Sequence, residues 1–128
     1  MFSLNRLTKE VRKEAEKMLK TIHSPYMVRV MGFIEDHANL CIVMEYFKHG
    51  DLKSFQQKYM DCECWARKMK MVLDIALGMN YLHTLDPPII HRDLKLNNVF
   101  VGNGFDVKVG LDNIYYRVSQ SFILTFFH

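Results

Sequence analysis

Apolar and charged residues alternate with a helical period at the start of the chain. Between residues 8 and 22 the apolar positions recur every three or four residues, and Lys, Arg and Glu fill most of the others. Thr8 is placed to cap the first free backbone N–H groups, and Pro25 prevents the helix from continuing. The pattern predicts an amphipathic helix over residues 8–22. Its apolar face is formed by Val11, Ala15, Met18, Leu19 and Ile22.

Two runs rich in strand-forming residues follow, MVRVMGFIE at 27–35 and NLCIVMEY at 39–46, and a polar turn separates them. This arrangement predicts an antiparallel pair of strands. Gly50 then interrupts the chain, and Asp51 is placed to cap a short helix over residues 51–59.

A long helix is predicted from about residue 62 to residue 83, because one set of residues again recurs at intervals of three or four. The positions that show this spacing are Trp65, Met69, Val72, Ala76, Met79 and His83. Gly78 lies inside the segment, although glycine costs about 1 kcal/mol relative to alanine in a helix. We therefore expect another element to pack closely against the helix at Gly78.

Beyond the two prolines at 87 and 88 the chain holds only short apolar runs, at 89–90, 99–101 and 107–109, which we expect as short strands. The sequence Gly-Asn-Gly at 102–104 joins the last two and is a strong signal for a β-hairpin. A helix, two strands, further helices and short strands form an α+β order. With 49% hydrophobic and 24% charged residues, the composition is that of a soluble globular protein.

Charge and cysteine content narrow the classes of function. The net charge of +3 comes from Lys and Arg that are interleaved with Glu between residues 9 and 20, which is typical of a solvated helix face and argues against a nucleic-acid partner. No apolar run is long enough to span a membrane. The apolar end SFILTFFH at 121–128 is expected either as core strand material or as a segment that lacks its packing partner. Three cysteines without zinc-ligand spacing and the lack of a secretory signal predict a cytoplasmic protein.

The segment HRDLKLNN at residues 91–98 places an acid, a lysine and an amide on one loop. A surface turn with incidental charges is the alternative, but these residue types and their spacing resemble the catalytic loop of the protein kinases. In that family, phosphoryl transfer depends on positioning and charge neutralisation. The resemblance implies that Asp93 accepts or orients the proton of the attacking hydroxyl, that Lys95 lies against the γ-phosphoryl group and that Asn98 holds Mg²⁺.

Other segments follow the order of the same family. The helix at 8–22 resembles helix C, which implies that Glu14 is the acid that pairs with a lysine of the third strand; its charged neighbours leave a surface role open. The strand CIVMEYF resembles the fifth strand and the hinge. This resemblance implies adenine contacts at Met44, Glu45 and Phe47; taken alone, Met44 would be an ordinary core residue.

Two further residues have both a family role and an ordinary one. Asp51 is a candidate for binding the ribose hydroxyls, or it only caps the helix that follows. Phe100 is a candidate for the apolar residue beneath the adenine, or it is an ordinary core aromatic.

Lys95 and the phrases VMEYFKHGDL and IIHRDLK are similar to serine/threonine kinases of the receptor-interacting and tyrosine-kinase-like group. This similarity implies ATP and Mg²⁺ as cofactors, phosphorylation of a protein substrate, and a partner in signal transduction. The implied fold is a partial protein-kinase-like fold, with helix C, strands four and five, the hinge, helices D and E, the catalytic loop and the hairpin after it.

The resemblance stops near Gly110. Leu111, Asp112 and Asn113 stand where the family has Asp-Phe-Gly, so that a leucine replaces the acid that binds magnesium. Asp112 could take its place only if the backbone shifts by one residue. Neither a Gly-rich loop nor a strand-three lysine precedes the first helix in these residues. We predict that residues 1–110 are a partial kinase domain and that residues 111–128 are a divergent tail.

Three functions remain open. The first is an ATP-dependent serine/threonine protein kinase, of which this chain is an incomplete domain that need not be active. The second is a non-catalytic, pseudokinase-like fragment that acts by protein–protein interaction, which the departures at Leu111 and before the first helix favour. The third is a small-molecule phosphotransferase with a kinase-like fold, against which Arg92, Lys95 and the hinge-like VMEYF argue.

Overall fold

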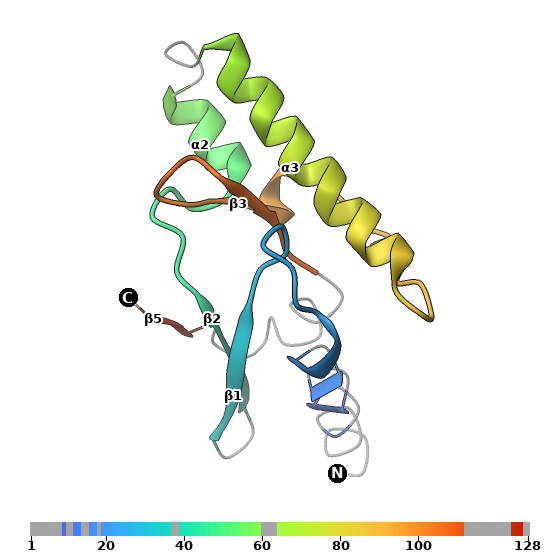
Figure 1. Cartoon of the computed structure of the whole chain (residues 1–128). Helices are drawn as coiled ribbons and strands as arrows, with labels where there is room; N and C mark the ends of the chain where they lie inside the picture. Colours follow the sequence, from blue (N-terminus) through green and yellow to red (C-terminus); the bar gives the residue numbers. More distant parts are fainter. Residues whose placement is uncertain are drawn as a thin grey trace. The chain divides into compact units, whose positions relative to one another are not determined.

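A computed structural model describes residues 9, 12–13, 16–17, 19–36, 39–59, 64–111 and 124–126 of the chain (Figure 1). These residues form two compact units. Unit 1 contains the described residues of Met1–His23, Arg29–Tyr46 and Asp112–His128, and unit 2 contains those of Ser24–Val28 and Phe47–Leu111.

Unit 1 begins with a helix. The described residues between Lys9 and Thr21 are helical, as the sequence predicts, and the chain leaves the helix at Ile22. The Arg12 side chain donates to the Glu16 carboxylate one turn later, at 3.2 Å. Its guanidinium also lies 5.4 Å from the centre of the Phe33 ring in the adjoining sheet. Six residues of the predicted helix lie outside the described residues: Thr8, Glu10, Val11, Glu14, Ala15 and Met18.

The sheet of unit 1 has the strand order β1-β2-β5, and Figure 1 shows β5 beside β2. β1 (Val30–Asp36) and β2 (Asn39–Glu45) are antiparallel, which confirms the predicted pair, and a bulge interrupts the pairing between Val30 and Gly32. β5 (Leu124–Phe126) runs parallel to β2, opposite Val43–Glu45. The apolar end of the chain therefore supplies a strand, and β2 becomes the central strand of the three.

Unit 2 consists of two helices and a hairpin. Its elements are α2 (Leu52–Tyr59), α3 (Trp65–Thr84), the 3-10 turn η2 (Leu96–Asn98), β3 (Val99–Val101) and β4 (Val107–Val109). β3 and β4 are antiparallel, as predicted, and Gly102 N donates to Asp106 O at 2.9 Å across the turn.

The backbone before β1 lines the other side of β4. Val28 N donates to Val109 O, and Val109 N donates to Tyr26 O, both at 2.9 Å. The first residues of the predicted strand at 27–35 therefore belong to unit 2, and β1 begins only at Val30.

Residues 89–90 do not form a strand, and this prediction was wrong. Ile89 N donates instead to Leu82 O near the end of α3, at 3.0 Å. An apolar pair is too short to distinguish a strand from a segment that returns along a helix.

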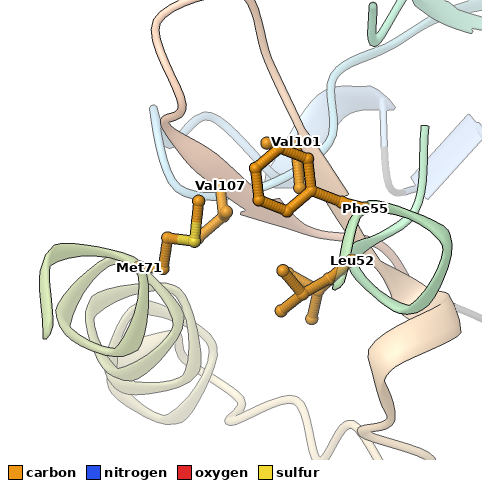
Figure 2. Packing of buried hydrophobic residues seen from close by; sticks show 6 residues of the cluster. Leu52, Phe55, Met71, Val101 and Val107 are labelled. Carbon is orange, nitrogen blue, oxygen red and sulfur yellow. The ribbon is translucent and has the colours of Figure 1, made fainter. Parts of the chain in front are cut away.

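Six apolar side chains from both helices and the hairpin form the core of unit 2. In Figure 2, Met71 of α3 points toward Val107, and Phe55 of α2 points toward Val101. Burying such side chains contributes about 1.5–3 kcal/mol each, as an upper estimate. The cluster consists of Leu52, Phe55, Met71, Val99, Val101 and Val107.

Helix α3 buries a different face from the one whose spacing predicts it. The buried positions are Met71, Asp74, Gly78 and Leu82. Trp65 and Val72, from the predicted stripe, are 75% and 57% exposed. The helix itself is therefore confirmed, but apolar residues occupy two of its faces, and the hairpin packs against the other one.

Gly78 marks the closest approach to α3. A Cβ at this position would lie 2.9 Å from Tyr26 O and 3.1 Å from a methyl group of Val109, which confirms the close packing that the sequence predicts. Because the Tyr26 oxygen belongs to the backbone, a side chain can fit only if the segment alongside β4 moves.

We expect Gly78→Ala to lower the free energy of unfolding by about 1–3 kcal/mol through overpacking, even though alanine favours a helix by about 1 kcal/mol. Urea denaturation followed by circular dichroism measures this change. Ala76→Gly, at an exposed position of α3, is the matched control and should lower stability by about 1 kcal/mol through helix propensity alone. A Gly78→Ala protein more stable than the wild type would contradict the packing described.

Candidate functional site

A buried histidine anchors the loop of residues 91–98. His91 is 1% exposed, and its Nδ1 accepts a hydrogen bond from Asp93 N at 3.3 Å. Its Nε2 lies 2.6 Å from Gly110 O, just beyond β4. Because Nδ1 is an acceptor, these partners assign the proton to Nε2, which donates to the carbonyl. The start of the loop is thus tied to the end of the hairpin.

Gly110 is held from the other end of the loop as well. Its N–H donates to Asn98 O at 2.7 Å. A Cβ at this position would lie 2.9 Å from the Phe100 ring and 3.3 Å from Asn98 O. Only glycine therefore allows the backbone to pass this close to the loop.

Asp93, Lys95 and Asn98 are brought together by this frame. Lys95 Nζ donates to Asp93 Oδ2 at 3.0 Å, and Asn98 Nδ2 donates to the backbone oxygen of Asp93 at 2.7 Å. Asn98 is buried, whereas the side chains of Asp93 and Lys95 are 43% and 39% exposed. An ion pair at such exposure contributes about 0–1 kcal/mol to stability. Its main effect is to place a carboxylate and an ammonium group at the surface of a fixed loop.

The turn between His91 and Asp93 has an unusual backbone. Arg92 has a φ of 64°, in the left-handed region that residues other than glycine seldom adopt. Such conformations persist where surrounding contacts determine them, and they concentrate at functional sites. The hydrogen bonds of His91 to Gly110 and to Asp93 N are contacts that hold Arg92 in this conformation.

Three of the predicted nucleotide contacts belong to unit 2. The rings of Phe47 and Phe100 lie 5.3 Å apart with their planes tilted by 33°. Asp51 forms an isolated backbone bridge with Phe100, so that all three residues are neighbours. The Asp51 carboxylate accepts hydrogen bonds from Ser54 N at 3.0 Å and Ser54 Oγ at 2.8 Å. Its role as the cap of α2 is thus confirmed, and its contact with a ribose stays a prediction.

The remaining predicted contacts belong to unit 1. Met44 is 3% exposed within β2. Glu45 Oε1 accepts a hydrogen bond from Arg29 N at 2.7 Å, and Glu45 N donates to Arg29 O at 3.1 Å. Glu45 thus binds the backbone of the residue that precedes β1. Glu14 lies outside the described residues. The nucleotide and lysine contacts proposed for these three residues stay predictions.

Asp74 positions the hairpin, a role that the sequence analysis missed. It is 6% exposed, and its Oδ2 accepts hydrogen bonds from Lys70 Nζ at 2.5 Å and from Val107 N at 3.3 Å. The signal was present, because the acid lies at helical spacing from Met71, Gly78 and Leu82. An acid on a buried face requires such partners.

Leu111 follows the clamped Gly110 and is 7% exposed. Within the described ranges, no three His, Cys, Asp or Glu side chains lie close enough together to hold a metal ion. The part of the chain that the structure describes also contains no helix long and apolar enough to cross a membrane.

Comparison with known proteins shows which family and which relatives the chain resembles. The family model "Protein tyrosine and serine/threonine kinase" matches residues 3–119. A probable serine/threonine-protein kinase of Dictyostelium discoideum is 44% identical over 107 residues, which cover 80% of this chain and 10% of the relative. The serine/threonine-protein kinase CTR1 of Arabidopsis thaliana is 38% identical over 113 residues, which cover 84% of this chain and 13% of the relative.

A third relative is the receptor-interacting serine/threonine-protein kinase 2 of Bos taurus, 36% identical over 103 residues, which cover 78% of this chain and 19% of the relative. The chain thus spans at most a fifth of the length of these three relatives. Their names confirm the predicted similarity to the receptor-interacting and tyrosine-kinase-like group, and the α+β elements confirm the predicted partial kinase fold. The family match over residues 3–119, which is most of the chain and includes the loop clamped by His91 and Gly110, shows that the chain belongs to the protein tyrosine and serine/threonine kinase family.

Proposed function

We propose that the chain carries the catalytic-loop part of a cytoplasmic, ATP-dependent serine/threonine kinase that phosphorylates proteins in signal transduction. The observation that supports this proposal most directly is the cluster of Asp93, Lys95 and Asn98 on a loop fixed at both ends. Preorganised groups of this kind need no rearrangement when charge develops in a transition state.

Each residue of the cluster has a defined task in the proposed reaction. The Asp93 carboxylate accepts or orients the proton of a substrate hydroxyl, a contribution of about 10²–10⁴-fold in rate for a positioned acid or base. The Lys95 ammonium neutralises charge on the transferred phosphoryl group. Asn98 contributes by holding the backbone of Asp93 in place through its Nδ2 group.

Phe47, Phe100 and Asp51 are proposed to receive the nucleoside. The two phenylalanine rings offer apolar surface to an adenine, and Asp51 lies beside Phe100 through their backbone bridge. Met44 and Glu45, and Glu14 as the partner of a strand-three lysine, belong to the same proposal through the family resemblance.

Nucleotide binding is tested by thermal unfolding of the chain with increasing ATP. A ligand present at 100 times its Kd stabilises a protein by about 2.7 kcal/mol, so a rising melting temperature is expected. Tripolyphosphate is the matched control, because a positively charged chain can bind phosphates without recognising adenine. An equal shift with ATP and tripolyphosphate would argue against the proposed nucleoside site.

Phosphoryl transfer is tested with γ-labelled ATP and casein as a general protein substrate. We expect the isosteric change Asp93→Asn to keep the thermal shift with ATP and to lower transfer by about 10²-fold or more. Equal transfer by the wild type and Asp93→Asn would exclude Asp93 as the catalytic group.

A second candidate function is a non-catalytic module that acts by protein–protein interaction. It is supported by an apolar groove of about 350 Å³ that is lined mainly by residues of α2 and α3, including Phe55, Met71 and Val72. The neighbouring surface of α3 exposes Trp65 and Leu73. A thermal shift with ATP but no transfer above the level of Asp93→Asn would favour this function.

A further inference from the structure

We infer that the described residues of the catalytic loop and of the end of β4, up to Leu111, form no divalent-cation site and that the chain binds adenine nucleotide without magnesium. The inference deepens the proposed function, because its second half rests on nucleotide binding. It starts from the residues around Gly110, where the loop and the end of β4 meet.

The ligands that these residues offer do not suit Mg²⁺. Magnesium prefers six oxygen ligands in near-octahedral geometry, and proteins bind it through one or two carboxylates together with phosphate oxygens. Near Gly110 the loop offers the Asn98 amide, whose Nδ2 donates to the backbone of Asp93, so that the amide can offer a cation one neutral oxygen, Oδ1. The carboxylate of Asp93 is paired with Lys95 Nζ at 3.0 Å, and the proposed reaction requires it for the substrate hydroxyl.

Leu111 occupies the position from which a second acid would act. It directly follows Gly110, whose N–H and C=O groups are both bonded to the loop, so that its backbone is held close to Asn98 and His91. Its side chain is 7% exposed and cannot coordinate a cation. The clamp therefore presents an apolar group where a kinase loop of this geometry needs a carboxylate.

The leucine at position 111 also removes a reason for a cation to accompany the triphosphate. A carboxylate beside a triphosphate repels it, and a bridging magnesium ion offsets that repulsion. Leucine in place of the acid removes this part of the repulsion, and the Asp93 carboxylate that remains is paired with Lys95. The Lys95 ammonium remains at the loop to attract phosphate charge. Free ATP and Mg-ATP are therefore expected to bind with similar affinity.

The first test measures metal binding directly, without nucleotide. Mn²⁺ is added to the folded chain, and the free ion is counted by electron paramagnetic resonance, since manganese takes the same oxygen ligands as magnesium. We expect the wild-type chain and Asn98→Ala to bind Mn²⁺ equally weakly. Leu111→Asp should bind at least about tenfold more tightly, because a carboxylate attracts a divalent cation strongly at a buried position.

Leu111→Asn is the matched control for this gain. It introduces a polar side chain of the same size as Asp but no charge, and we expect a gain of less than about threefold from a neutral amide ligand. Circular dichroism checks that each variant is folded. The Mn²⁺ titration of the wild-type chain tests the inference without any substitution. A wild-type site that binds as tightly as that of Leu111→Asp, and that Asn98→Ala removes, would overturn the inference.

The second test compares the thermal shift with ATP in EDTA and in excess Mg²⁺. Equal shifts are expected for the wild type, and for Leu111→Asp a shift that is larger with Mg²⁺ than with EDTA. A wild-type shift that requires Mg²⁺ would overturn the inference. If ATP causes no shift in either buffer, nucleotide binding by the chain is excluded, and with it the proposed nucleoside site and the second half of this inference. The Mn²⁺ titration still decides the first half.

Discussion

His91→Ala is expected to lower the free energy of unfolding of the chain by about 3–5 kcal/mol, the largest effect of any substitution considered for the loop. The reason is that two losses coincide at one residue. The change leaves a cavity at a side chain that is 1% exposed, and it leaves Gly110 O and Asp93 N without their partner. Urea denaturation followed by circular dichroism gives the free energy.

Two comparisons separate the anchoring role of His91 from the general effect of removing a histidine. His91→Gln can still donate a hydrogen bond to Gly110 O, so we expect it to lose about half as much stability as His91→Ala. His83→Ala removes an exposed histidine from the last turn of α3 and should cost less than about 1 kcal/mol. Equal losses for His83→Ala and His91→Ala would refute the anchor.

Asn98→Asp is expected to lower the free energy of unfolding by about 2–3 kcal/mol at neutral pH. The two side chains have the same shape, but the variant brings a carboxylate oxygen toward the Asp93 carbonyl oxygen that now accepts the Asn98 amide at 2.7 Å. Because the site is 4% exposed, water cannot solvate the new charge. At acidic pH the protonated carboxyl can donate to the carbonyl, so the stability deficit should grow as the pH rises from about 4.

Asn97→Asp provides the control for this substitution. Asn97 is adjacent in η2 but exposed, and the same change there should alter stability by less than about 0.5 kcal/mol. Measuring both variants between pH 4 and pH 8 tests the pH dependence. A deficit for Asn98→Asp that does not change over this range would mean that the amide donor is not what holds Asp93.

The elements that the sequence predicts well are those marked by a local signal, such as a helical period, a capping residue or a turn sequence. Residues 51–59 carry a capping acid and become α2, and the Gly-Asn-Gly turn lies in the β3–β4 hairpin. The cluster of Asp93, Lys95 and Asn98 was likewise predictable, because its members lie within six residues and one loop suffices to bring them together.

Contacts between distant residues could not be predicted in this way. The spacing of Asp74 from Met71 and Gly78 marks one apolar face of α3, but Val72 belongs to a second one. Which of the two faces is buried depends on where the hairpin packs. The clamp on Gly110 has the same origin, since it joins residues 12 and 19 positions apart. The strand predicted at 89–90 was wrong for a different reason: two residues are too few to show a period.

The parallel pairing of β5 with β2 bears on how the protein can be handled at high concentration. Leu124–Phe126 covers the backbone of Val43–Glu45 on one side, so β2 is not an edge strand. Exposed edge strands are templates on which other copies of a chain assemble. An affinity tag or a clipped end that displaces these three residues would leave β2 uncovered, and turbidity and light scattering should then increase with protein concentration.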